Sequence, residues 1–205
     1  MFKVFRKKSR FANDEKGSLS IEAVFAFPML FWAATALFTF FDAYKVQNAS
    51  YRGNYTISDM ISRETEPIDQ TYVDGLHQVF RFMTHTGPET SWLRVSVVKC
   101  NSDCGDEAAR DLEFVWSHSA GGARSLTAAD LPFFADKIPL MAFGDPLILV
   151  ETSRQYRPPF ASALVSFAER NLVSHVVTRP RFANQVCWET CVTGNGDGNG
   201  DGGNI

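Results

Sequence analysis

The residues with the clearest chemical potential lie near the start of the chain, around Gly17. Residues 16–22 read KGSLSIE, and the nineteen residues that follow, 23–41, carry no charge. A peptidase that works at a membrane face needs the backbone to approach closely, and glycine allows this because it has no side chain. Cleavage after Gly17 would release an α-amine at Ser18. Gly17 and Ser18 therefore form a candidate processing site.

Glu22 places a carboxylate at the edge of the uncharged run. Burying an acidic side chain at the centre of a membrane helix costs about 2.5–3.5 kcal/mol on insertion scales, and less near the interface. A nearby cation offsets this cost, and the new amine of Ser18, in the same chain or in a neighbouring subunit, is the natural one. We therefore predict that Glu22 is an assembly carboxylate. Pro28 predicts a helix kink that is tolerated in a bilayer.

Residues 23–41 are long enough to cross a membrane. A hydrocarbon core of about 30 Å needs about 20 helical residues at 1.5 Å each. A cleaved secretory signal has a shorter apolar run, of about 7–15 residues, before a small-residue cleavage site. No such site follows Phe41, where the sequence continues DAYK. The sequence thus predicts a retained transmembrane helix over residues 18–42.

The distribution of charge predicts the direction of crossing. Residues 1–17 carry six basic and two acidic side chains, a net of +4, whereas the eighteen residues after Phe41 are neutral overall. Basic flanks stay in the cytoplasm, so residues 1–17 are expected to form a cytoplasmic leader and the rest to be exported. Since the whole chain carries −3, the part after Gly17 carries −7. An acidic exported domain argues against a nucleic-acid partner.

The cysteines lie after the apolar run, in two pairs with the same spacing. They are Cys100 with Cys104 and Cys187 with Cys191. An even number of cysteines in an exported region predicts disulfides, and four cysteines allow three connectivities. The alternative is a four-cysteine zinc site, although such sites more often use shorter spacers in reducing compartments.

Periodicity beyond the span predicts helices first and strands afterwards. Small and apolar residues recur at helical steps in the continuation of the first helix (Val46, Ser50, Gly53, Ile57 and Met60), and a second helical stripe covers residues 68–83. The first stripe suits packing against another helix or against the chain's own domain. Alternation of apolar and polar residues predicts strands. The Thr127 hydroxyl, with Asp130 three residues later, predicts the start of a short helix. Residues 161–170 are also expected to be helical. The predicted strands are residues 93–97, 112–116, 147–152 and 173–178. Residues 43–193 should therefore form an α+β domain, with helices packed on a small antiparallel sheet.

Residues 194–205 are almost entirely glycine, asparagine and aspartate. Such a segment has no apolar side chains to bury, so we expect a flexible tail. The sequence NGDGNG is similar to the first half of a calcium-binding loop, but no acidic residue follows at the twelfth position. A weak calcium site is the alternative interpretation.

The N-terminal pattern resembles a known family. Residues 14–17 (DEKG) followed by residues 18–28 (SLSIEAVFAFP) are similar to the N-terminal region of TadE-like pseudopilins, which belong to the tight-adherence (Flp-type) branch of bacterial type IV pilus machinery. Glu22 and Pro28 lie where the family pattern places them. Weaker similarities fall in residues 58–63, 150–151 and 156–158. TadG-like proteins share the N-terminal pattern but are usually much longer.

The resemblance implies a pilin-like fold and a minor pseudopilin, needed for pilus assembly without being its main subunit. It implies cleavage after Gly17 by a prepilin peptidase, and partners among other pilins or pseudopilins and inner-membrane assembly proteins. It also implies a single-pass protein of the bacterial inner membrane, with a periplasmic domain that enters or supports an extracellular pilus. The cysteine pairs and the C-terminal tail have no counterpart in the family pattern.

The sequence offers little evidence for an enzyme. The chain lacks the common nucleophile-elbow, zinc-protease and phosphate-loop motifs, and its four histidines have no metal-ligand spacing. We therefore predict no catalytic residue, no metal and no cofactor. A pocket with converging Glu151, His118 or His175 would favour an exported enzyme, although an ion pair of Glu151 with Arg154 or Arg157 is the simpler expectation. A second alternative is an uncleaved, membrane-anchored binding or sensor module.

Overall fold

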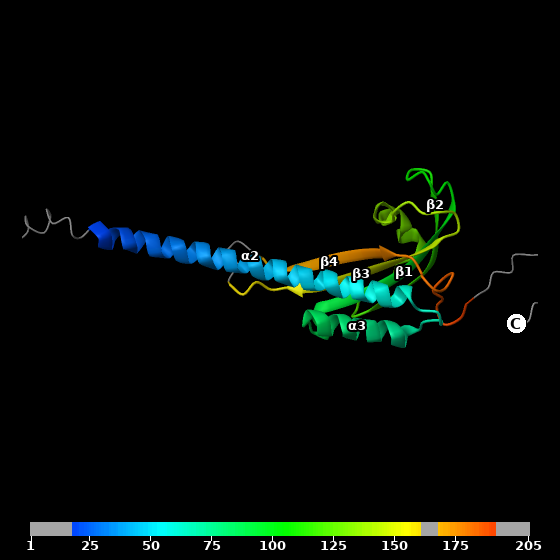
Figure 1. Ribbon diagram of the computed structural model, residues 1–205, viewed down its shortest axis with the longest axis horizontal. Helices are drawn as coiled ribbons and strands as arrows, with labels where there is room; N and C mark the ends of the chain where they lie inside the picture. The colour runs from blue at the N-terminus through cyan, green and yellow to red at the C-terminus, as the bar shows by residue number, and fades with distance from the viewer. Residues whose placement is uncertain (1–17, 161–167, 192–205) are drawn as a thin grey trace, which may run out of the picture. The chain divides into compact units, whose positions relative to one another are not determined.

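The computed structural model describes residues 18–160 and 168–191, which contain two long helices, four strands and three short 3₁₀ helices (Figure 1). In chain order these are α2 (Ser18–Ser62), α3 (Gln70–Thr84), η2 (Pro88–Thr90), β1 (Ser91–Ser102), β2 (Asp111–Ala120), η3 (Ala128–Phe133), η4 (Ala135–Lys137), β3 (Pro146–Tyr156) and β4 (Arg170–Thr178). The chain divides into two compact units. In the first, α2 up to Lys45 associates with Tyr156–Arg170, and the second contains Val46–Gln155 and the chain from Asn171 onward.

Helix α2 is a single helix of 45 residues. It joins the predicted span to the predicted helix that follows, and Pro28 lies inside it without ending it. Among the described residues, one helix is long and apolar enough to cross a membrane, and it is this one. The prediction of a long apolar N-terminal helix is therefore confirmed.

Helix α3 begins two residues later than its apolar stripe suggests. Asp69 is its N-cap and accepts a hydrogen bond of 2.8 Å from the backbone N–H of Tyr72, which satisfies one of the free donors of the first turn. The helix ends at His85, whose left-handed backbone (φ 53°) closes the last turn. Its buried face includes Val73 and His77, while Ile68 lies outside the helix in a bridge to Trp188.

The four strands form one antiparallel sheet in the order β2-β1-β3-β4. In its centre, Val97 lies opposite Trp116 on β2 and opposite Ile148 on β3. The four predicted strands fall within these elements, so the prediction of an α+β fold with an antiparallel sheet is confirmed. The capped turn predicted at Thr127 is also present, because the Thr127 N–H and hydroxyl both donate to the Asp130 carboxylate.

The main core lies between one face of the sheet and the two helices of the second unit. Its buried side chains include Ile57 and Ile61 from α2, Val73, Leu76 and Phe80 from α3, and Leu93, Val95, Val97, Ile148 and Val150 from the sheet. Gly53 allows α2 to approach α3 closely, since a Cβ there would stand 3.0 Å from Phe80 Cδ2. The segment that contains η3 and η4 packs on the opposite face through Ile138 and Met141.

Two details of the predicted helices are wrong. Met60 was expected on the buried stripe of α2, but it is exposed and Ile61 is buried in its place, because Ile57 and Ile61 are separated by a full helical turn. The helix expected over residues 161–170 does not reach its end, since Arg170 begins β4. Residues 161–167 lie outside the described part of the chain, as do residues 1–17 and the predicted tail.

Candidate functional site

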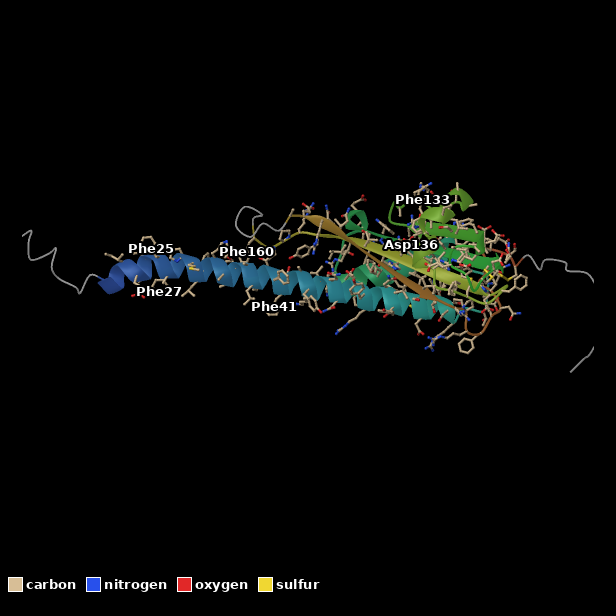
Figure 2. The ribbon with its side chains drawn as sticks, turned by 90° about the horizontal axis from the view of Figure 1, so that it is seen from above. Phe25, Phe27, Phe41, Phe133, Asp136 and Phe160 are labelled. Carbon is tan, nitrogen blue, oxygen red and sulfur yellow. A yellow bond between two sulfur atoms is a disulfide. The ribbon has the colours of Figure 1, made fainter. Side chains whose placement is uncertain are left out.

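The N-terminal part of α2 exposes a continuous apolar surface. Its exposed large side chains are Ile21, Val24, Phe25, Phe27, Met29, Leu30, Phe31, Trp32, Leu37, Phe38, Phe40 and Phe41. Phe25, Phe27 and Phe41 project from the helix in Figure 2. Apolar side chains that cover a helix on all sides are stable only inside lipid or against other apolar helices. This segment is therefore the candidate site for membrane insertion and helix association.

The predicted processing and assembly residues are placed only in part. Gly17 lies outside the described residues, and Ser18 is the first residue of α2. Glu22 is exposed on the same helix. Because residues four apart share a face of a helix, Glu22 projects on the side of α2 where the chain enters it at Ser18. The processing site and the pairing of Glu22 with an amine stay predictions.

Tyr156 is held against the C-terminal end of the apolar segment, a contact that sequence reasoning missed. Its hydroxyl donates to the Asp42 carboxylate at 3.1 Å and lies 3.4 Å from the backbone oxygen of Thr39. Burial, together with the nearby Asp42, raises the pKa of Tyr156 to about 12. Phe160 meets Phe38 edge to face, with ring centroids 5.8 Å apart. No local pattern reveals this contact, since Tyr156 and Asp42 are 114 residues apart.

Each cysteine pair closes its own short loop. Cys100 is bonded to Cys104 and Cys187 to Cys191, with Cα atoms 5.9 and 5.0 Å apart. Of the alternatives that the sequence left open, the structure therefore has local disulfides, rather than crossed ones or a shared metal site. The first disulfide is buried, whereas Cys191 of the second is exposed.

An aromatic cluster lies beside the second disulfide. The rings of His118 and Trp188 stack with centroids 3.3 Å apart, and Trp116 packs against Trp188 at 5.7 Å. The Trp116 indole N–H donates to the Val186 carbonyl at 3.0 Å. Burial lowers the pKa of His118, so its imidazole tends toward the neutral form that can stack on an indole.

The same cluster borders a cavity of about 600 Å³. Its wall includes Lys99, Trp116, Gln185 and Trp188. The backbone of Ile68 fixes this wall, because its N–H donates to the Cys187 carbonyl at 3.0 Å and its carbonyl accepts from Glu189 N–H at 2.8 Å. A volume of this size is within the usual range of small-molecule sites.

Glu151 forms a buried ion cluster on the other face of the sheet. Its carboxylate accepts from Arg94 at 2.5 Å and from Lys137 at 3.4 Å, and Lys137 lies over the Phe134 ring. The predicted pairing with Arg154 or Arg157 is wrong. Side chains three apart on a strand point to opposite faces, whereas Arg94 is directly opposite Glu151 on β1. The cluster fastens η4 to the sheet.

The residues named for an enzymatic site do not converge as a group. His118 is opposite Val95 on β1 and Glu151 is opposite Arg94, and adjacent residues of a strand face opposite sides of the sheet. His175 is exposed on β4. Within residues 18–160 and 168–191, no group of three or more histidine, cysteine or acidic side chains is placed to hold a metal ion.

Comparison with known proteins assigns no family to this arrangement. No family model, no curated protein and no solved structure matches the chain.

Proposed function

We propose that this chain is a minor pseudopilin of a tight-adherence pilus, anchored in the bacterial inner membrane and needed for pilus assembly. One observation carries the proposal. A single helix of 45 residues is apolar and exposed in its N-terminal part, and packs on a four-stranded sheet of the same chain in its C-terminal part. Such a helix suits both bilayer insertion and association with the helices of other subunits.

The residues at the start of α2 supply the assembly chemistry. In the proposed cycle a prepilin peptidase removes the basic leader after Gly17 and frees the amine of Ser18. The Glu22 carboxylate then pairs with that amine in a neighbouring pilin. Because an unpaired carboxylate is unfavourable among apolar helices, this pairing would favour one register between subunits over others.

A membrane-anchored binding or sensor module is the second candidate. The cavity beside Trp188 favours it, since a pilin packed only through its N-terminal helix needs no such pocket. The two candidates differ in processing, because a binding module would keep its basic leader as part of the anchor.

The test is the intact mass of the protein purified from its own membranes. An N-terminus at Ser18 supports the pseudopilin, and a chain that retains residues 1–17 supports the plain anchor. Gly17→Ala should block cleavage, because the added methyl group obstructs close approach of the backbone. Ser20→Ala is the matched control and should be processed normally. Equal processing of both variants would refute the proposed site.

A further inference from the structure

We propose that residues 156–160, at the start of the β3–β4 connection, lie in the membrane interface and contact lipid. The inference rests on the membrane span of the proposed function and adds a second membrane contact to it. Phe160 is the inserting side chain and Tyr156 sets its depth. The partner is the outer surface of the bilayer that α2 crosses.

The length of α2 locates the outer boundary of the membrane. Glu22 lies at the cytoplasmic edge of the uncharged run, so the apolar core begins close to this residue. A core of about 30 Å corresponds to about 20 helical residues, which ends the core close to Asp42. The ring of Phe38, which meets Phe160, belongs to a residue four positions, or about 6 Å, before Asp42. Phe160 therefore lies within about 6 Å of the depth where the acyl chains meet the headgroups.

The pattern of buried residues along α2 also places the membrane boundary near Phe160. Thr35, Thr39 and Ala43 form a stripe at four-residue steps, and all three are buried, although their neighbours on the helix are mostly exposed. Thr35 precedes Asp42 by seven residues, which is about 10 Å along the helix. One side of α2 is therefore buried over about the last 10 Å of the uncharged run. The part of α2 that remains free of cover on all sides, residues 21–34, is only about 21 Å long. This is too short to span the membrane without the covered part.

The chemistry of residues 156–160 suits the interface. Pro158 and Pro159 have no backbone N–H, so fewer donors lose water when the segment meets lipid. Phe160 is half-buried and lies beside α2 in Figure 2. Arg157 is exposed and paired with Glu169 at 2.7 Å, which keeps its charge on the water side. Tyrosine is typical of interfacial anchors, and phenylalanine is among the side chains that interfacial segments insert into the bilayer.

Lipid is the expected partner, rather than a helix of another subunit. Phe38 belongs to the uncharged run, so whatever surrounds this part of α2 in the membrane-anchored protein also reaches Phe160. A protein partner would protect Phe160 only in the assembled filament, whereas lipid contact exists in the isolated chain.

The test is tryptophan quenching in the full chain, reconstituted in phosphatidylcholine vesicles that contain brominated lipid. Of the four tryptophans of the parent, Trp32 alone lies in the uncharged run of α2, so the quenched component of the parent reports on insertion of α2 in every sample. Phe160→Trp should add a component that bromines at acyl positions 6 and 7 quench more strongly than bromines at positions 11 and 12. Phe182→Trp, which replaces an exposed phenylalanine of the second unit, is the control and should add an unquenched component.

The outcomes separate this inference from the proposed function. If Trp32 is quenched while Phe160→Trp behaves like Phe182→Trp, the membrane span is supported and lipid contact of residues 156–160 is refuted. If Trp32 itself is not quenched, the span fails and both proposals are refuted.

A second measurement, of cysteine accessibility, does not require a tryptophan at position 160. Phe160→Cys should react several-fold more slowly than Phe182→Cys with a membrane-impermeant maleimide in vesicles. Equal rates would refute lipid contact of residues 156–160.

Discussion

The Tyr156 hydroxyl donates a hydrogen bond of 3.1 Å to the carboxylate of Asp42, the first charged residue after the apolar run of α2. Tyr156 ends β3, so this bond ties the end of a strand to the helix at the point where its uncharged surface stops. The tyrosine is 2% exposed and Asp42 is partly exposed. A charge-assisted bond between such groups is stronger than one between neutral groups.

Tyr156→Phe should therefore destabilise the protein. Hydrogen bonds to charged groups contribute about 1.5–3 kcal/mol, and we expect a loss near the lower value because Asp42 can still reach water. The measurement is urea unfolding of the full chain in detergent, followed by circular dichroism. Tyr55→Phe, at an exposed tyrosine of α2, is the control and should change the free energy of unfolding by less than about 0.5 kcal/mol. Equal effects of the two changes would contradict a special role for the Tyr156 hydroxyl.

The pKa of Tyr156 also predicts a dependence on pH. Burial and Asp42 raise it from an unfolded value of 10.0 to about 12, so between these values the unfolded chain loses the tyrosine proton while the folded chain keeps it. The contribution is complete below pH 10 and disappears as the pH rises through 12. The difference in unfolding free energy between the parent and Tyr156→Phe should thus shrink over this window. A difference that stays constant from pH 9 to 12 would contradict the assignment.

The sequence predicted the elements of this protein better than their contacts. The apolar run and the alternation of residues 93–97 follow from local periodicity, which the backbone geometry imposes directly. The partner of Glu151 does not, because the register that brings Arg94 opposite it depends on how two distant strands pair. The stacking of Trp188 on His118 likewise depends on a chain segment that returns to the sheet after about 70 residues.

Removing the charge of Glu151 should lower the free energy of unfolding far more than removing a charge from a surface ion pair. Arg94 and Glu151 have side chains 12% and 2% exposed, so Glu151→Gln leaves a buried guanidinium without a counter-charge. We expect a loss of about 3 kcal/mol in the free energy of unfolding. Glu169→Gln removes the exposed partner of Arg157 and should cost less than about 1 kcal/mol.

A double change tests the physical reason for that sensitivity. Arg94→Met combined with Glu151→Leu removes the buried pair at once and leaves Lys137, whose side chain is 31% exposed and can keep its charge in water. The double variant should therefore recover most of the stability that Glu151→Gln loses. If the double variant is less stable than Glu151→Gln, the cost comes from lost packing rather than from an uncompensated charge.

The two disulfides should be reduced in a fixed order. Cys100 and Cys104 are buried, whereas Cys191 is exposed, so a soluble thiol can attack the second disulfide first. Limited reduction, alkylation and peptide mass analysis should find Cys187 and Cys191 labelled before the other pair. The bridge between Ile68 and Trp188 should keep this segment in place, and opening the loop should cost about 2 kcal/mol. Simultaneous labelling of both pairs would contradict this order.

Glu22 provides the most direct test of assembly. Glu22→Ala should leave membrane insertion intact, or slightly improve it, because a carboxylate at the edge of the apolar run disfavours insertion. It should nevertheless reduce piliation or surface adhesion, since the neighbouring Ser18 amine loses its counter-charge. The measurement compares membrane fractions with pilus counts in the producing bacterium.

Two matched variants separate charge from shape at this position. Glu22→Gln keeps the size of the side chain without its charge and should behave like Glu22→Ala. Glu22→Asp keeps the charge on a shorter side chain and should retain part of the piliation, because an ion pair tolerates a small change in distance better than the loss of a charge. Normal piliation with Glu22→Gln would show that the carboxylate does not set the register between subunits, and the assembly role proposed for Glu22 would be lost.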